Sequence, residues 1–335
     1  MSDPASGDSR GPRLSGGEKT AGKFAVLIFC SVLVLLGGVF LGRSPAGFFS
    51  GNPQAFSILF SLRIPRVLLA FMTGGALAVS GAVFQAVLKN QLASPYILGI
   101  SSGASLGAAL VMALGLSFAG GLTLPAAGFA FGLGTVFLVV ALSSRLDRSL
   151  SNNTVILFGM VFSLFVNAVL TTMLSLFREE LRNLLVWQLG SFSLKGWAYV
   201  RLMLPFLVAG LAGVYRYAKE IDILSFGEEE ARSMGVSARG VRKRLFLFSS
   251  LLTGAAVALT GAIGFVDLIA PHAARKIIGA KHRLVIPFSF FSGGCLMAAA
   301  DIAARTIISP SELPVGAVTA LIGAPFFAWI YFRRS

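Results

Sequence analysis

Residues 13–24 have the residue types and spacing of two nucleotide-handling motifs. The segment reads RLSGGEKTAGKF, in which LSGGE has the form of an ATPase signature loop. Gly17, Gly22 and Lys23 also fit the G-x-x-x-x-G-K spacing of a phosphate-binding loop. In such a loop, backbone N–H groups at a helix N-terminus hold the phosphates, and a following Ser or Thr binds magnesium. The first question is therefore whether this chain could hydrolyse ATP.

The elements that would have to position these residues are missing from the sequence. A phosphate-binding loop follows a strand, but the preceding residues, MSDPASGDSRGP, contain no apolar run. Phe24 stands where the magnesium-binding hydroxyl belongs. The two candidate motifs also share residues, although an ATPase keeps them far apart. We therefore expect residues 1–23 to be a flexible cytoplasmic tail and not a nucleotide site.

The composition is that of a polytopic membrane protein. Of 335 residues, 56% are hydrophobic and 13% are charged, and the mean hydropathy is +0.82. The net charge of +14 does not indicate nucleic-acid binding, because the charges lie in short gaps between apolar runs. Cys30 and Cys295 lie inside such runs without a C-x-x-C motif, so we expect neither a disulfide nor a metal site. The first run lacks an A-x-A-like cleavage site and is interpreted as a retained span.

Hydropathy and charge together predict ten membrane crossings. Nine apolar runs are long enough for a span of roughly 20 residues; they are Phe24–Leu41, Ile64–Leu88, Pro95–Leu116, Leu122–Leu142, Thr154–Phe177, Ala198–Tyr215, Leu245–Ile263, Leu284–Ala300 and Leu313–Phe332. Nine spans would leave the basic segment 275–283 and the basic C-terminus outside, against the positive-inside rule. A further crossing at Phe265–Ile278 returns both to the cytoplasm. We therefore expect an all-α fold with both termini cytoplasmic.

Two features of these runs indicate a compact bundle. The crossing at 265–278 is short, at about 21 Å as a helix, and Pro271 is expected to interrupt it. Broken backbone at membrane depth is tolerated where it is buried in protein or lines a cavity. Gly99, Gly103 and Gly107 recur every four residues, which is typical of helices that pack closely in membranes.

The largest internal loop, residues 217–244, has the pattern of two short helices at a corner. Its residues Glu228, Glu229, Ala231, Arg232 and Met234 precede Gly235, which is expected to end the first helix. Ser237 can cap a second short helix leading to Arg242. The pattern favours a rigid surface for a partner protein, and a solvated loop of mixed charge is the alternative.

These segments, taken together, resemble the permease subunits of type II ABC importers, the FecCD-type family for ferric siderophores, haem and vitamin B12. GEEEARSMGV resembles the family's coupling helices, at about residues 221–241 here. The stretch from Arg63 to Leu110 is similar to its second and third helices, and the later landmarks LVWQLGSFSLKGW, TGAIGFVDLIAPHAAR and LPVGAVTALIGAPFFAWI follow in order. The chain departs from the family pattern at Gln91, where a proline is usual, and at Asp267, where a glycine is common.

The resemblance implies a permease domain over residues 24–335 with ten helices, working as a homodimer or with a close relative in the cytoplasmic membrane. Such permeases are not enzymes. A separate ATPase dimer binds ATP and magnesium, and a periplasmic or lipid-anchored binding protein delivers the cargo. The chain itself would need membrane lipids but no cofactor, metal or nucleic acid. An iron complex, first a ferric siderophore, is the expected cargo, with haem or cobalamin as alternatives.

By resemblance, Arg63, Arg66 and Arg305 match positions that receive acidic residues of the binding protein. Guanidinium groups make fixed, bidentate contacts with carboxylates, which suits that role. The alternatives are arginines that snorkel to the interface and, for Arg305, an i, i+4 pair with Asp301.

The resemblance places a cytoplasmic gate at Asn90 and at Ser151, Asn152 and Asn153. Uncharged polar residues can close a pathway by hydrogen bonding and then part without leaving buried charges. Helix capping by Ser151 or Asn152 is the alternative. For the intramembrane residues Asp267 and Asp301, we rank structural pairing above a proton relay.

Two other classes remain open. An ion-coupled secondary transporter would need intramembrane charges, of which the sequence offers few. An intramembrane enzyme would need a nucleophile or a metal motif, and the isolated His272 lacks a second ligand in the sequence around it.

Overall fold

The computed structural model describes residues 16–41, 53–118, 120–147 and 150–332, and it is helical, with no strand among those residues. Within the described ranges, seven helices are long and apolar enough to cross a membrane: α1 (Gly16–Phe40), α3 (Ile64–Val87), α5 (Thr123–Leu146), α6 (Asn152–Leu176), α8 (Trp197–Arg216), α11 (Ala238–Thr260) and α13 (His282–Thr306). Shorter elements are α2 (Pro53–Ile58), η1 (Leu59–Arg63), η2 (Pro95–Leu98), α4 (Ile100–Ala113), η3 (Gly120–Leu122), α7 (Leu184–Gln188), α9 (Ala218–Phe226), α10 (Glu228–Ser233), α12 (Val266–Ile278) and α14 (Val315–Phe332).

The prediction of an all-α polytopic membrane protein is confirmed. Each predicted crossing overlaps one of the long helices or one of the shorter helices α4, α12 and α14. Because these three are short for a membrane of about 30 Å, ten is an approximate count of crossings.

Helix α1 begins at Gly16, ahead of the predicted start of the first span at Phe24. Gly17, Gly22 and Lys23 therefore lie on a continuous helix and do not form a loop around a phosphate. Residues 16–23, which were predicted to belong to a flexible tail, are therefore helical. The other residues of the predicted tail, 1–15, lie outside the described part of the chain.

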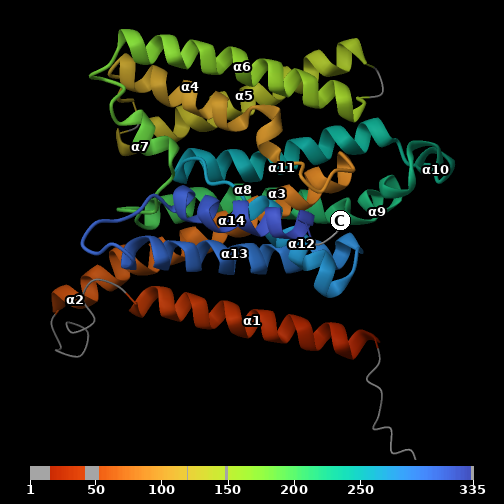
Figure 1. The fold of residues 1–335 in the computed structure, drawn as a ribbon, viewed down its shortest axis with the longest axis horizontal. Coiled ribbons are helices and arrows are strands. Elements are labelled where there is room, and N and C mark those ends of the chain that lie inside the picture. Colours follow the sequence, from red (N-terminus) through yellow and green to blue (C-terminus); the bar gives the residue numbers. More distant parts are fainter. Residues whose placement is uncertain (1–15, 42–52, 119, 148–149, 333–335) are drawn as a thin grey trace, which may run out of the picture.

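The core of the bundle is α3, which is almost entirely buried and packs against α8, α11, α12 and α13. Gly74 of α3 and Gly293 of α13 let the two backbones meet, because a Cβ on either residue would collide with the other helix. Helices α1 and α6 lie at opposite edges of the bundle (Figure 1) and are largely exposed. Since dispersion and close packing hold membrane helices together, α3 is the element around which the rest is organised.

Helix α4 carries the predicted glycine stripe. Gly99 precedes the helix with a φ of 77°, in the left-handed region that favours glycine. Gly103 faces Thr135 and the carbonyl of Phe131, and Gly107 faces the carbonyl of Ala127, so both lie against α5. The stripe thus lies in the contact between α4 and α5.

Helix α12 differs from the expected broken crossing. It continues through Pro271, and the irregular stretch lies before it, at residues 261–265. Proline leaves the carbonyl four residues earlier without a helical donor, and here Gln85 Nε2 donates to that carbonyl, of Asp267, at 3.2 Å. A side chain of α3 therefore replaces the lost hydrogen bond, which explains why the helix does not break at Pro271.

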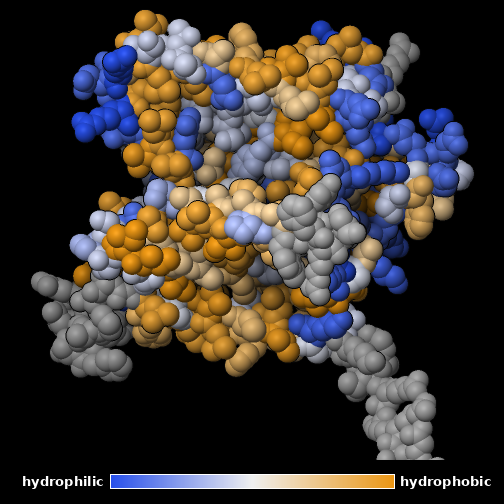
Figure 2. Space-filling model, viewed as in Figure 1, coloured by the Kyte–Doolittle hydropathy of each residue, from blue (hydrophilic) through white to orange (hydrophobic). Residues whose placement is uncertain are grey.

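The chain has two polar ends and an apolar middle. Figure 2 shows hydrophobic residues over most of the face between two hydrophilic ends. The start of α1 and the corner made by α9 and α10 lie at one end, and α2 and α7 lie at the other (Figure 1). We call these the α10 end and the α2 end.

Candidate functional site

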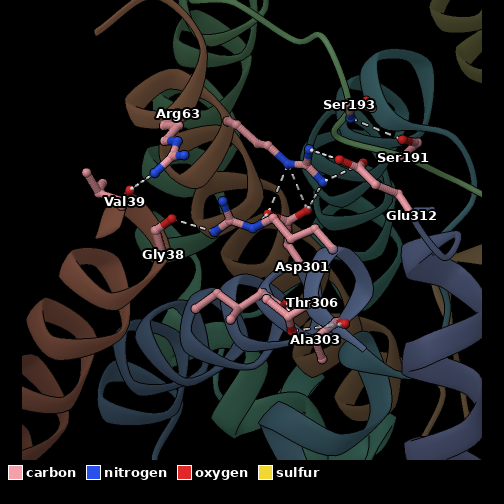
Figure 3. Close-up of polar contacts among 12 residues, drawn as sticks. Gly38, Val39, Arg63, Ser191, Ser193, Asp301, Ala303, Thr306 and Glu312 are labelled. Carbon is pink, nitrogen blue, oxygen red and sulfur yellow. Dashed lines mark hydrogen bonds and ion pairs between the residues drawn. The ribbon is translucent and has the colours of Figure 1, made fainter. Parts of the chain in front are cut away.

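At the α2 end, the predicted residue Arg63 lies on the π-helical turn η1. Pro65 has no N–H, so the carbonyl four residues before it, of Ser61, loses its α-helical donor, and such a loss favours a wider turn. The indole of Trp197 donates to the carbonyl of Phe60 in the same turn at 2.8 Å. Arg63 Nη1 donates to the carbonyl of Val39 at 3.4 Å (Figure 3). The π-helical turn thus places the Arg63 side chain beside the last residues of α1.

Arg66, one turn along, is shared between two carboxylates. Its Nη2 lies 2.8 Å from Asp301 Oδ1, and its Nε donates to both oxygens of the same carboxylate at 3.1 and 3.2 Å. Its Nη1 and Nη2 also donate to the two oxygens of Glu312, each at 3.1 Å. Figure 3 shows Asp301 and Glu312 on adjoining sides of the cluster. The guanidinium therefore joins α3, α13 and the segment before α14.

Arg305 completes the cluster. Its Nε lies 3.5 Å from Asp301 Oδ2, and its Nη2 donates to the carbonyl of Gly38 in α1. The side chains of Asp301 and Arg305 are 1% and 8% exposed, whereas that of Glu312 is 28% exposed. Glu312 is thus the member that solvent or another protein reaches first.

The cluster borders a pocket of about 330 Å³. Its lining is Ile58, Leu62, Arg63, Arg66, Ser193, Leu194, Arg305 and Glu312. The three predicted arginines therefore meet at one pocket, although they come from positions 63 to 305 of the sequence. The i, i+4 pairing of Arg305 with Asp301 is present, while contact with a binding protein stays a prediction for all three.

At the α10 end, the predicted coupling residues form a compact corner. Gly235, with a φ of 75°, ends α10: its N–H donates to the carbonyl of Arg232 at 3.0 Å, and that of Val236 donates to Ala231 at 2.8 Å. This pair of bonds is the Schellman motif, which fixes the direction in which the chain leaves a helix. Ala231 is fully buried. Because its anchor is buried, α10 is held firmly against the bundle.

The outer face of the corner is displayed to solvent. Glu229 and Arg232 are exposed, and Met234 is 59% exposed. The face borders a hollow of about 460 Å³ lined by Glu228, Arg232, Gly235, Val236, Ser237, Ala238 and Arg239. A rigid helix with exposed charges and a methionine beside a hollow is a surface that a partner protein can dock on.

The second helix of the corner is not short, as the sequence led us to expect. Ser237 caps it, accepting from the N–H of Gly240 at 3.4 Å. The helix then continues to Thr260 as α11, because no glycine or proline stands between Arg242 and the apolar run. The additional short helix of the corner is α9, which precedes α10.

The predicted gate residues lie in two connections, one between α3 and η2 and the other between α5 and α6. The Asn90 carboxamide accepts from the N–H of Leu92 at 2.9 Å and so fixes its own turn. Ser151 is the N-cap residue of α6, and its hydroxyl lies 2.9 Å from that of Thr154. Asn152 is half-buried, and Asn153 is exposed. The side chain of Ser151 makes no capping hydrogen bond to the backbone of α6, although the residue holds the N-cap position. The gating role of these residues stays a prediction.

Asp267 has a polar partner in the buried core. The hydroxyl of Ser94, which precedes η2, donates to Asp267 Oδ2, and Arg275 donates to Gln85 Oε1. The Tyr96 hydroxyl donates to the carbonyl of Ile263 at 2.8 Å. The Asp267 carboxylate is therefore tied to the connection that carries Asn90. Among the described residues, no group of three His, Cys, Asp or Glu side chains could hold a metal ion.

Three residues of these sites were not predicted from sequence: Glu312, Arg242 and Asp222. Arg242 Nη1 lies 2.6 Å from Glu228 Oε1, and Asp222 Oδ1 lies 2.6 Å from His282 Nδ1. The partners can be far apart in the sequence: Glu312 and Arg66 are separated by 246 residues. The local signal was only that each is a charged residue beside an apolar run.

Comparison with known proteins gives a consistent assignment. The model of the FecCD transport family matches residues 24–333. The uncharacterized ABC transporter permease protein YvrB of Bacillus subtilis is 42% identical over 287 residues, covering 85% of this chain and 81% of that protein. The hemin transport system permease protein HmuU of Yersinia pestis is 35% identical over 321 residues, covering 92% and 94%.

One solved structure has the same fold along almost the whole chain. It is an ABC transporter assigned to the metal-chelate type, in an inward-facing conformation. The TM-score is 0.84 at 29% sequence identity, and the alignment covers 95% of this chain and 99% of the other. The helical arrangement described above is therefore that of a transporter's membrane subunit.

Proposed function

From the premise that this chain belongs to the FecCD transport family, whose relatives are ABC permeases, we propose that it carries an iron complex across the cytoplasmic membrane. A ferric siderophore is our first candidate for the cargo. Relatives named for Fe(3+)-citrate and iron(3+)-hydroxamate import support an iron chelate. Relatives named for hemin and for vitamin B12 make haem or cobalamin the alternative.

The observation that carries the proposal is the presence of two different polar surfaces at opposite ends of one apolar bundle. The arginine pocket at the α2 end would receive acidic residues of a binding protein outside the cell. The corner of α9 and α10 would sit on a separate ATPase dimer inside, which binds ATP and magnesium. In this arrangement the ATPase dimer, and not this chain, would hydrolyse ATP.

A second copy of the chain would complete the pathway. Helices α6 and α14 support this, because both expose large apolar residues, such as Leu164 (70%) and Leu321 (74%). One such face could meet lipid, and the other could meet the same face of a second subunit, as in a symmetric dimer. The gate residues Asn90 and Ser151–Asn153 would then face their copies across the pathway.

The test is uptake by the complete complex in liposomes, with its ATPase and binding protein. We expect uptake of an iron-55-labelled siderophore that requires ATP, with haem and cobalamin taken up more slowly. Preferential uptake of haem or cobalamin would correct the cargo alone. Uptake that persists without ATP and follows an ion gradient would favour a secondary transporter and contradict the importer assignment.

A further inference from the structure

Arg242 connects the coupling corner to the connection between α5 and α6. Its side chain is 5% exposed, although it lies on the first turns of α11 beside the solvent-exposed corner. The terminal nitrogen Nη1 lies 2.6 Å from Glu228 Oε1, at the start of α10. The same nitrogen donates to the carbonyl of Leu150 at 3.3 Å. Because Nη1 carries two hydrogens, it can make both contacts at once.

The Leu150 end of this connection is held tightly. Leu150 is fully buried and has a φ of 55°, a conformation that an L-residue adopts only when its surroundings enforce it. On its C-terminal side, the N–H of Ser151 and the hydroxyl of Thr154 donate to Asp147 Oδ2 at 2.9 and 3.2 Å. A displacement of the Leu150 carbonyl therefore acts directly on the restrained start of α6.

We propose that Arg242 is a positioning residue that transmits the movement of α10 to the gate residues Ser151–Asn153. The inference rests on the proposed function, because it takes α10 as the element that the ATPase moves. Glu228 is the input contact and the Leu150 carbonyl is the output contact. The linkage joins the two sites by a single side chain, and it spans 92 residues of sequence.

The chemistry of the linkage requires arginine. A buried guanidinium can pair with a carboxylate and still donate to a carbonyl, since it has five N–H groups in a fixed plane. Lysine would keep the positive charge and the attraction to Glu228, but its compact ammonium group cannot hold both partners in the same directions. Coupling between two such contacts is typically worth 5- to 150-fold in an equilibrium.

The experiment uses the complete complex in liposomes and compares Arg242→Lys, Arg242→Met and Glu228→Gln with wild type. The matched control is Arg216→Met, which removes the same charge from an exposed position at the end of α8. Two quantities are measured: the cargo transported per ATP hydrolysed, and the ATP-dependent change in labelling of Asn153→Cys in a background without Cys30 and Cys295. Asn153 is suited to labelling because it is exposed.

We expect the cargo transported per ATP to fall about tenfold in both Arg242 variants and in Glu228→Gln, and the ATP-dependent change in labelling to be lost. The control should match wild type. If Arg242→Met does not assemble, Arg242→Lys decides, since it preserves the charge. Normal transport per ATP and normal labelling changes in Arg242→Lys and Glu228→Gln would overturn the linkage. If instead the wild-type complex shows no ATP-driven transport, the proposed function fails first, and the two failures are distinguishable.

Discussion

Among single residues, Asp301 and Glu312 both pair with Arg66, but the two pairs differ in how far they are exposed to solvent. Asp301 is buried beside both Arg66 and Arg305, so removing either arginine would leave a buried charge without enough partners, which is costly. Glu312 is 28% exposed, and its pair with Arg66 is open to water. Exposed pairs contribute little to stability. Glu312 is therefore the exchangeable partner, and it occupies the place that a docking carboxylate would take.

We predict that Glu312→Gln binds the binding protein more tightly than wild type. Removing the internal carboxylate leaves Arg66 with donors facing the pocket, so an incoming carboxylate no longer has to displace one. The gain should be about two- to fivefold in affinity at low salt and should shrink as salt is added. Affinity can be measured on the permease and ATPase complex in nanodiscs.

Glu180→Gln is the control for that variant, because it removes the same charge from an exposed residue of the segment between α6 and α7. It should leave the affinity within error of wild type. Weaker binding by Glu312→Gln alone would mean that Glu312 holds Arg66 in its docking position instead of competing for it.

Among the helices, the contact between α4 and α5 depends on a residue without a side chain. In Gly103→Ala, the new Cβ would collide with the Thr135 hydroxyl and would lie 2.8 Å from the Phe131 carbonyl. We expect a loss of about 1 to 3 kcal/mol and a lower melting temperature in detergent. Gly134→Ala on α5 is the control, since nothing lies within 4 Å of its Cβ. Equal melting temperatures for the two variants would contradict a tight contact at Gly103.

The contact between α9 and α13 should depend on pH through Asp222. Partial burial raises the pKa of Asp222, but hydrogen bonds from the ring and the backbone N–H of His282 outweigh it and hold the pKa below its ordinary value. A carboxyl group whose pKa is lowered by folding stabilises the folded state above its unfolded pKa, and this contribution is lost as the pH falls through the folded pKa.

Asp222→Asn should accordingly lower the melting temperature at pH 7 by about 1 to 3 °C, because the side chain is one-third exposed and its contacts are screened by solvent. The difference from wild type should close as the pH falls below about 4. Glu180→Gln should show no difference at any pH. A difference that stays constant down to acidic pH would show that the carboxylate's charge is not what holds α9.

The sequence predicted the elements better than the contacts between them. Long apolar runs determine where helices cross, and the positive-inside rule required the short crossing that became α12. The pairing of Asp301 with Arg305 could be predicted because it is one helical turn apart. The bonds of Arg66 to Glu312 and of Arg242 to Leu150 could not, since they depend on how distant helices pack. The helix through Pro271 was missed because Gln85, which replaces its lost hydrogen bond, lies on α3.

For the molecule as a whole, the distribution of Lys and Arg along the chain predicts which segments face the cytoplasm. In the ten-crossing arrangement, most of the 28 Lys and Arg residues face the cytoplasm. In a nine-crossing arrangement, α12 would not cross, and Lys281 and the residues around it would lie outside. Glu229 would be cytoplasmic and Glu180 external in both arrangements. Of these three positions, only Lys281 distinguishes the two arrangements.

We predict that single cysteines in a background without Cys30 and Cys295 will react with a membrane-impermeant maleimide according to the ten-crossing arrangement. Glu180→Cys should react in intact spheroplasts, whereas Glu229→Cys and Lys281→Cys should react only in inside-out vesicles. All three positions are exposed, so access from water decides the result and burial does not. Reaction of Lys281→Cys from the outside, with Glu229→Cys still protected, would mean that α12 returns to the side from which it came. The short helix would then be a re-entrant element. Because α13 would start outside and still cross, its far end with Arg305 and Glu312 would lie in the cytoplasm, and this would contradict the side proposed for the arginine pocket.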